Sequence, residues 1–309
     1  MFIHYVTAPQ KMFQKIELRR TRDFSEKINA TFEFIRQNIK PLAKSLIYIS
    51  GPFILLQGFF NGFYQKQALG GGGLNALDIF NTSSDLVMWL GLTYVFLLLG
   101  YISSIIVVYE FMRLYETKQN PETIDVPEVW EGVKENYLPM FGASIVMFFL
   151  VIIGMILLVI PGFYVAVAFS LVAPIMIIEK KGMGEALSRC FKLITEKWWS
   201  TFGLIFVTTL IVTVMALIFI IPQSIFSALF VLHAKDVAEE APLWQQAGMV
   251  ISSMFYSIGA NLLQAIVFVA IAFQFYNLIE RKEAKGLMGK LESFGKAPAD
   301  TASKNEETY

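Results

Sequence analysis

The sequence predicts an all-α membrane protein with six transmembrane helices, and three observations support this fold class. The chain of 309 residues is 55% hydrophobic and only 16% charged, with a mean hydropathy of +0.56, whereas a soluble domain carries about 25% charged residues. Long stretches contain no charged residue at all. The lysines and arginines are distributed very unevenly among the segments between those stretches.

The uncharged stretches set the number of spans. Five runs contain no Lys, Arg, Asp or Glu: Ser45–Gln65, Leu86–Tyr109, Pro139–Ile178, Trp198–Ala234 and Ala241–Ile279. A helix needs about 20 apolar residues to cross a bilayer. The third run is long enough for two helices, with a break expected at Pro161-Gly162, so the sequence predicts six spans.

The basic residues predict the orientation, because cytoplasmic loops are enriched in Lys and Arg. The segment up to Lys44 carries nine of the 25 cations, residues 110–138 carry three, residues 179–197 carry five, and the tail from Glu280 carries six. The remaining two are Lys66 and Lys235. Six spans place the four rich segments on one side, so we expect both termini in the cytoplasm.

Amphipathic segments precede the spans and predict a repeat. Asp23 and Glu26 have the spacing of a capping box, and Ile28, Phe32, Ile35 and Ile39 then form one apolar stripe, with Lys27, Arg36 and Lys40 off it. Residues 32–42 align without a gap to residues 130–140, and residues 191–199 form a weaker third copy. We therefore expect three parallel repeats, at about 23–113, 125–179 and 183–279, each an interfacial helix followed by a transmembrane hairpin. A cytoplasmic arm (1–22) precedes this domain (23–279), and a partly disordered cytoplasmic tail (280–309) follows it.

The third amphipathic segment is the clearest. Its apolar face is predicted at Leu187, Phe191, Ile194 and Trp198, opposite a charged face with Arg189 and Lys192. Interfacial helices of this kind present cations and tryptophans to the headgroup layer. The residues that we expect to contact a lipid headgroup or a partner are Arg189, Lys192, Trp198, Trp199, Arg36, Lys40 and Trp130.

Four amides lie at membrane depth in the predicted spans: Gln57, Asn261, Gln264 and Gln274. Hydrogen bonds between helices are one interpretation. A polar cavity, or a socket for the helix of a partner, is the other.

The sequence offers no constellation for catalysis, so we expect a protein that is not an enzyme and that holds no cofactor or metal. His4 and His233 fall on opposite sides of the membrane in this topology and cannot share a metal. Cys190, the single cysteine, has no histidine nearby to act as a base. Gly70–Gly73 and Glu239-Glu240 are interpreted as loop residues.

One stretch resembles a known family. The residues that carry the resemblance are Pro161-Gly-Phe-Tyr164, Ser170, Ala173-Pro174, Glu179, Glu185–Arg189 and Trp198-Trp199. With these residues in the same order, the stretch resembles the bacterial membrane domain that accompanies some glycerophosphodiester phosphodiesterases, and YciC-like proteins. Cys190 stands where that family usually has serine. The resemblance implies a multi-pass protein of the bacterial inner membrane. The phosphodiesterase activity is not implied, because no phosphodiesterase domain is present.

These features lead to two expectations for function. The first is a non-enzymatic scaffold or accessory subunit of a larger membrane complex, which docks through its interfacial helices and cytoplasmic loops. The alternative is a lipid-binding, lipid-scrambling or transport protein, and an uncoupled carrier of a small solute is a variant of it. The expected partners are membrane lipid and other membrane or cytoplasmic proteins, and no nucleic acid.

Overall fold

The computed structural model describes residues 15–70, 84–118, 123–236 and 242–284, together with residues 288 and 291. Within these residues the secondary structure is helical, as predicted, and six helices are long and apolar enough to cross a membrane. The helices are α1 (Phe24–Ser45), α2 (Gly51–Gly70), α3 (Ser84–Thr117), α4 (Val126–Leu157), α5 (Val159–Phe169), α6 (Val172–Ile178), α7 (Met183–Ile194), α8 (Trp198–Asp236) and α9 (Leu243–Glu283).

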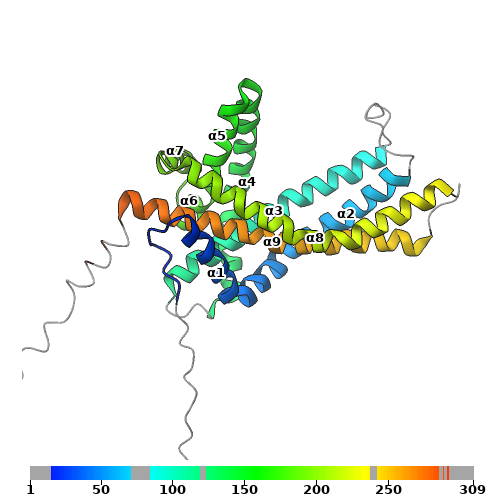
Figure 1. The fold of residues 1–309 in the computed structure, drawn as a ribbon, viewed down its shortest axis with the longest axis horizontal. Helices are drawn as coiled ribbons and strands as arrows, with labels where there is room; N and C mark the ends of the chain where they lie inside the picture. Colours follow the sequence, from blue (N-terminus) through cyan, green and yellow to red (C-terminus); the bar gives the residue numbers. More distant parts are fainter. Residues whose placement is uncertain are drawn as a thin grey trace, which may run out of the picture.

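Four long helices, α2, α3, α8 and α9, form the main bundle, and α9 is its centre. α9 packs against α2, α3 and α8 and also contacts α1 and α7. Its 41 residues correspond to a length of about 60 Å, and the side chains from Ala265 to Ile279 are buried in an unbroken series. In Figure 1 the bundle runs to the right, whereas the hairpin of α4 and α5 projects upward from the end of the bundle where α7 lies.

The approach of α2 to α9 is unusually close because two glycines face α9. A Cβ atom on Gly58 would lie 2.6 Å from the Cα of Met254, and one on Gly62 would lie 2.6 Å from the Cα of Val250. These glycines form the Gly-x-x-x-Gly spacing that lets two helix backbones meet in a membrane. Backbone contact therefore fixes the α2–α9 pair.

Polar side chains cross-link the helices inside the bundle. Ser50 donates a hydrogen bond to Ser103 at 3.0 Å, and Ser104 donates one to the Oδ1 of Asn261 at 3.1 Å. Gln274, 1% exposed, donates to Thr201 at 2.8 Å. For Asn261 and Gln274, hydrogen bonding between helices is thus the observed role.

The first helix begins where the sequence predicts, and the side chains that it buries include polar ones that lie off the predicted stripe. Asp23 and Glu26 form a complete capping box, with the Glu26 amide donating to Asp23 at 2.7 Å. Phe34 and Asn38 are buried, whereas Ile39 of the predicted stripe is 55% exposed. Lys27, expected to stand off the apolar face, is 2% exposed and donates to Gln274 at 2.7 Å and to Ser200 at 3.0 Å.

Three prolines lie inside long helices. Pro41, Pro139 and Pro222 lie inside α1, α4 and α8, and only a π-helical turn, Leu46–Ser50, separates α1 from α2. The second predicted interfacial segment is thus the first part of α4 and not a separate helix. The expected break at Pro161-Gly162 falls instead at Leu158, whose backbone is extended. Pro161 lies in the first turn of α5, where its missing N–H costs little.

The predicted N-terminal arm packs on the protein from residue 15. Lys15 donates to the carbonyl oxygens of Glu116 and Lys118, and Arg19 forms an ion pair with Glu116 at the end of α3. Arg22 is buried, and its amide donates to the Oδ1 of Asn277 at 2.8 Å. The part of the arm before residue 15, which includes His4, lies outside the described residues. Gly70, predicted as a loop residue, is the last residue of α2. The rest of that predicted loop, residues 71–73, the predicted loop at residues 239–240 and the predicted tail beyond residue 291 lie outside the described residues.

Candidate functional site

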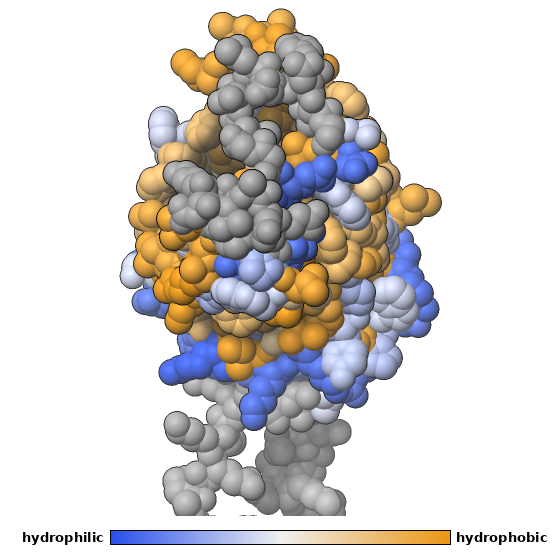
Figure 2. Space-filling view, turned by 90° about the vertical axis from the view of Figure 1, so that its right-hand side faces the viewer, coloured by the Kyte–Doolittle hydropathy of each residue, from blue (hydrophilic) through white to orange (hydrophobic). Residues whose placement is uncertain are grey.

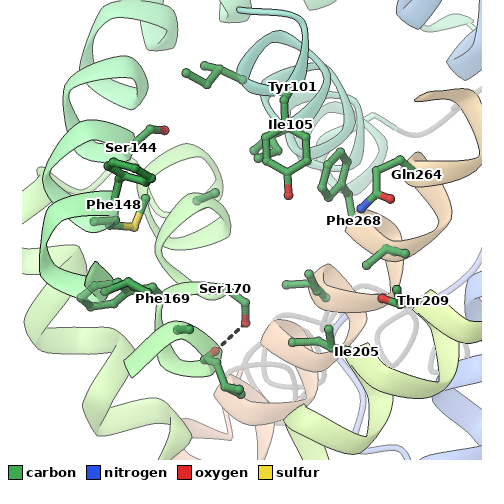
Figure 3. Close-up of a pocket in the computed structure, with 18 of the residues that line it drawn as sticks. Tyr101, Ile105, Ser144, Phe148, Phe169, Ser170, Ile205, Thr209, Gln264 and Phe268 are labelled. Atoms are coloured by element: carbon green, nitrogen blue, oxygen red, sulfur yellow. Dashed lines mark hydrogen bonds between the residues drawn. The ribbon is translucent and has the colours of Figure 1, made fainter. Parts of the chain in front are cut away.

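A large groove separates the α4–α5 hairpin from the main bundle. Its volume is about 1590 Å³. One wall comes from α3, α8 and α9, and the opposite wall comes from α4 and α5 (Figure 3). Side chains from both walls point into the space between them: Tyr101 and Ile105 on α3, Phe268 on α9, Ile205 on α8, and Ser144 and Phe148 on α4.

The lining of the groove is apolar and uncharged. No Asp, Glu, Lys, Arg or His is among its lining residues. The polar groups are hydroxyls and one amide: Tyr94, Tyr101, Tyr109, Ser144, Ser170, Thr209, Thr213 and Gln264. The hydroxyls of Ser144 and Ser170 donate to the carbonyl oxygens of Met140 and Val167 in their own chain segments. Such a surface suits long hydrocarbon better than it suits an ion or a charged solute.

Part of the groove lining belongs to the packed core. Tyr109 on α3 is 1% exposed and Met140 on α4 is 2% exposed, and both line the groove. Near the tip of the hairpin, α4 and α5 pack closely: a Cβ atom on Gly162 of α5 would lie 2.5 Å from the amide nitrogen of Met155 on α4. The two helices of the hairpin therefore form one wall of the groove together.

The outer surface of the molecule is also largely apolar. Figure 2 views the molecule from the right-hand end of the bundle, and hydrophobic residues cover much of that face, including its top, where the α4–α5 hairpin lies in Figure 1. Hydrophilic residues gather mainly toward the lower margin of this view. An apolar surface of this extent fits a lipid environment.

The predicted contact residues fall into two groups. Arg189 is partly buried and bonded within the protein: it forms ion pairs with Glu179 and, at 2.8 Å, with Glu283. Burial by itself lowers the pKa of Arg189, but the hydrogen bonds and charges of these two carboxylates outweigh it, and the pKa is raised. Trp198 is partly buried, and its indole N–H donates to the carbonyl oxygen of Tyr164 at 3.1 Å. The side chains that remain exposed are Lys192, Trp199, Arg36, Lys40 and Trp130.

The amides also divide. Gln264 lines the groove, near Phe268, whereas Asn261 and Gln274 are engaged between helices. Gln57 is half-buried on α2. The four amides therefore do not form one site.

Two features were missed by reasoning from the sequence. One is the buried Lys27, whose cation lies among the amide and hydroxyl groups of Gln274 and Ser200. The other is the groove itself. The Gly58–Gly62 spacing is visible in the sequence, but nothing in the apolar runs shows which of their faces line a groove.

No group of three or more metal-ligating side chains occurs in the part of the chain that the structure describes. His4 and the side chain of His233 lie outside that part. Cys190 is buried on the inner face of α7, and this burial raises the pKa of its thiol to about 11. Its thiol donates to the carbonyl oxygen of Leu187.

Comparison with known proteins gives one match. A family model described as "Domain of unknown function (DUF7847)" covers residues 84–279, which is more than half of the chain. The chain belongs to the DUF7847 family. The matched region begins with α3 and ends at the last buried residue of α9, so the DUF7847 domain includes both walls of the groove but not α1 and α2.

No curated protein and no solved structure matches the chain. The DUF7847 match carries no link to the membrane domain of glycerophosphodiester phosphodiesterases or to YciC-like proteins, so that resemblance stays a prediction from the sequence.

Proposed function

We propose that this protein binds a membrane lipid, with one or more acyl chains in the groove between the α4–α5 hairpin and the bundle. The observation that carries this proposal is the groove's uncharged, mainly aromatic and aliphatic lining over a volume of about 1590 Å³. This is larger than the roughly 300–1,000 Å³ of a pocket for a drug-sized ligand. A long, flexible hydrocarbon chain fits both the size and the chemistry of the lining.

Selectivity for a lipid has to come from shape and from the few polar groups. A lipid tail that leaves the bilayer for the groove gains no hydrophobic free energy, because both environments are apolar. Close packing against Phe148, Phe268 and Ile205 can still favour one tail geometry through dispersion contacts. Thr209 and Gln264 add hydrogen-bonding groups on the bundle side, in a medium without competing water.

An accessory subunit of a larger complex is the second candidate, and the exposed tryptophans are compatible with it. Trp130 is 43% exposed at the start of α4, and Trp199 is 77% exposed at the start of α8. Exposed tryptophans are common both in protein interfaces and at the lipid interface. In this version of the proposal the groove receives a helix from the partner instead of a lipid.

The proposed setting is the bacterial inner membrane, with both termini in the cytoplasm. The distribution of Lys and Arg supports this orientation. The order of elements also supports a repeat in two places, because α1 precedes the α2–α3 pair and α7 precedes the α8–α9 pair. The continuous α4 makes the second of the three proposed repeats the least regular.

The lipid proposal is tested by filling the groove. We expect Ser144→Trp combined with Thr209→Trp to reduce the phospholipid that co-purifies with the protein about tenfold, which corresponds to about 1.4 kcal/mol. Both residues face the groove from opposite walls, and neither hydroxyl is bonded to another helix in the described structure. Native mass spectrometry after exchange into a mild detergent measures the bound lipid.

Gly142→Trp is the matched control. Gly142 lies on the same helix as Ser144 but outside the groove lining, and nothing lies within 4 Å of a Cβ atom placed there. We expect this variant to keep its lipid. Equal lipid retention in the control and the double variant would overturn the proposal, and loss of a co-purifying protein instead of lipid would favour the accessory-subunit candidate.

A further inference from the structure

The position of α5 bears on how the α4–α5 hairpin sits in the membrane. By length and composition both α4 and the α5–α6 segment qualify as spans. In the structure, however, α5 contacts α7 and α8 near an end of the molecule that carries several charged residues. The depth of that end in the membrane limits how deeply the hairpin can insert into the hydrocarbon.

The helix α7 marks that charged end. Arg189 on α7 pairs with Glu283 at the end of α9 and with Glu179 at the end of α6. Lys282 donates to the backbone carbonyl of Lys192. A cluster of this many charges is costly inside hydrocarbon, so α7 and the end of α9 occupy one headgroup layer. The start of α8 lies next to this layer, because α8 begins at Trp198, directly after Lys197 and four residues after the end of α7.

The helix α5 runs beside this layer. Near its end, Phe169 packs edge-on against Phe191 of α7, with ring centroids 5.9 Å apart. Toward its start, Tyr164 stacks on Trp198, the first residue of α8, at 5.7 Å. Both ends of the Tyr164–Phe169 stretch therefore touch residues in or next to the headgroup layer. α5 runs along that layer and does not descend from it over this distance.

The tip of the hairpin cannot then lie far from the same layer. Leu158 precedes Tyr164 by six residues, which is at most about 9 Å of helix. The hydrocarbon core of a bilayer is about 30 Å thick. Even if this last stretch pointed straight across the membrane, it would end in the near half of the bilayer. Figure 1 shows the hairpin pointing away from the long axis of the bundle, with its tip far from the distal ends of α2, α3, α8 and α9.

The chemistry of the tip fits hydrocarbon. Ile156, Leu157, Leu158, Val159 and Ile160 are each 66–83% exposed, and the uncharged run around them extends from Pro139 to Ile178. Several backbone groups at the turn have hydrogen-bond partners within the hairpin. The amide of Leu158 donates to Gly154 at 3.0 Å, its carbonyl accepts from Gly162 at 3.2 Å, and Pro161 has no N–H to satisfy. Each backbone polar group that has a partner lowers the cost of exposing an irregular turn to lipid.

We propose that the α4–α5 hairpin is re-entrant: its apolar tip inserts among the acyl chains of the leaflet on the α7 side and does not cross to the opposite surface. The chain then crosses the membrane four times, through α2, α3, α8 and α9. Because four crossings are an even number, both termini stay on one side, as the distribution of cations predicts. This inference is independent of whether a lipid binds in the groove.

Single-cysteine labelling tests the proposal in the full-length protein. In a Cys190→Ser background, Leu158→Cys is compared with Asp85→Cys, exposed at the distal end of α3, and Ser188→Cys, exposed on α7. Serine can keep the short hydrogen bond that Cys190 makes to Leu187. We expect a membrane-impermeant maleimide to label Asp85→Cys from one side of the membrane and Ser188→Cys from the other. Leu158→Cys should react from neither side until the membrane is dissolved in a denaturing detergent.

A spin label on Leu158→Cys in vesicles of phosphatidylethanolamine and phosphatidylglycerol gives the second measurement. We expect the label to be accessible to oxygen, which partitions into hydrocarbon, and inaccessible to a polar nickel chelate. Labelling of Leu158→Cys from the same side as Asp85→Cys would show a full crossing and overturn the proposal. Labelling from the Ser188→Cys side, or poor access of both oxygen and the nickel chelate, would overturn it as well, by placing the tip in water or against protein.

Discussion

Replacing Gly58 and Gly62 together with alanine is expected to lower the thermal unfolding midpoint by about 5–15 °C. Glycine to alanine normally stabilises a helix, by about 0.5–1 kcal/mol per residue. Here each new Cβ atom would lie 2.6 Å from a Cα atom of α9, so the two backbones must separate. Overpacking of this kind costs about 1–3 kcal/mol per site, and about 2–4 °C of midpoint per kcal/mol is typical at 150–250 residues.

The control for this prediction is a glycine at which alanine is not expected to lower the unfolding midpoint. Gly91 lies on α3, and nothing lies within 4 Å of the place that a Cβ atom would take there. Gly91→Ala should therefore leave the midpoint unchanged or raise it slightly. Fluorescence-detected unfolding in the same detergent compares the two. A rise in midpoint for the Gly58→Ala/Gly62→Ala variant, matching Gly91→Ala, would show that the helices α2 and α9 are not in backbone contact.

Arg189→Ala is expected to destabilise the protein by about 2 kcal/mol, a fall in midpoint of about 4–8 °C. The substitution removes the guanidinium that bridges the carboxylates of Glu179 and Glu283. The cost stays below that of a fully buried pair, because Glu283 is 27% exposed and water screens part of its charge. Unfolding in detergent at low salt measures the effect, and high salt should reduce it.

Two comparisons separate this ion-pair effect from a change in net charge. Lys192→Ala removes the same charge from the exposed face of α7 and should have little effect on the midpoint. Arg189→Ala introduced into a Glu179→Gln/Glu283→Gln background should cost much less than in the native protein. An equal cost in both backgrounds would mean that Arg189 acts through contacts other than these two carboxylates.

The sequence was sufficient for the parts of the fold that depend on charge and length. Uncharged runs of about 20 residues or more predicted six apolar helices, and the structure confirms them. The capping box at Asp23 was predicted from two residues and is present. These features succeed because a charge in hydrocarbon and an uncapped helix end each have a cost that depends on local sequence alone.

The arrangement of the helices could not be predicted in the same way. In a water-soluble helix the apolar stripe marks the buried face, but in a membrane both lipid and protein interior are apolar, so α4 and α8 show no stripe that distinguishes the groove from the lipid. The same ambiguity applies to α1. Its apolar stripe at Ile28 and Ile39 is obvious in the sequence, yet Lys27 and Asn38 are buried because Gln274 and other polar groups receive them.

Arg189 illustrates a further limit. Its position on a charged helix face suggested a lipid headgroup as the partner. The carboxylate of Glu283 is 94 positions away in the sequence, and only the packing of α7 on the end of α9 brings it within 2.8 Å. The charge pattern thus indicated that the residue would find an anion, and the tertiary structure decided which one.

The groove and the shallow hairpin are physically connected. A hairpin that lies in one leaflet, beside a bundle that crosses both, leaves an open space that acyl chains of that leaflet can enter. The same geometry leaves no charged residue among those that line the space, which fits passive lipid contact better than ion-coupled transport.

A structure of the protein in lipid nanodiscs tests the central claim most directly. We predict elongated densities of acyl-chain shape between the α4–α5 hairpin and the wall formed by α3, α8 and α9, in contact with Phe148 and Phe268. A groove that is closed by the hairpin folding onto the bundle, or that is filled by a helix of another protein, would contradict this prediction.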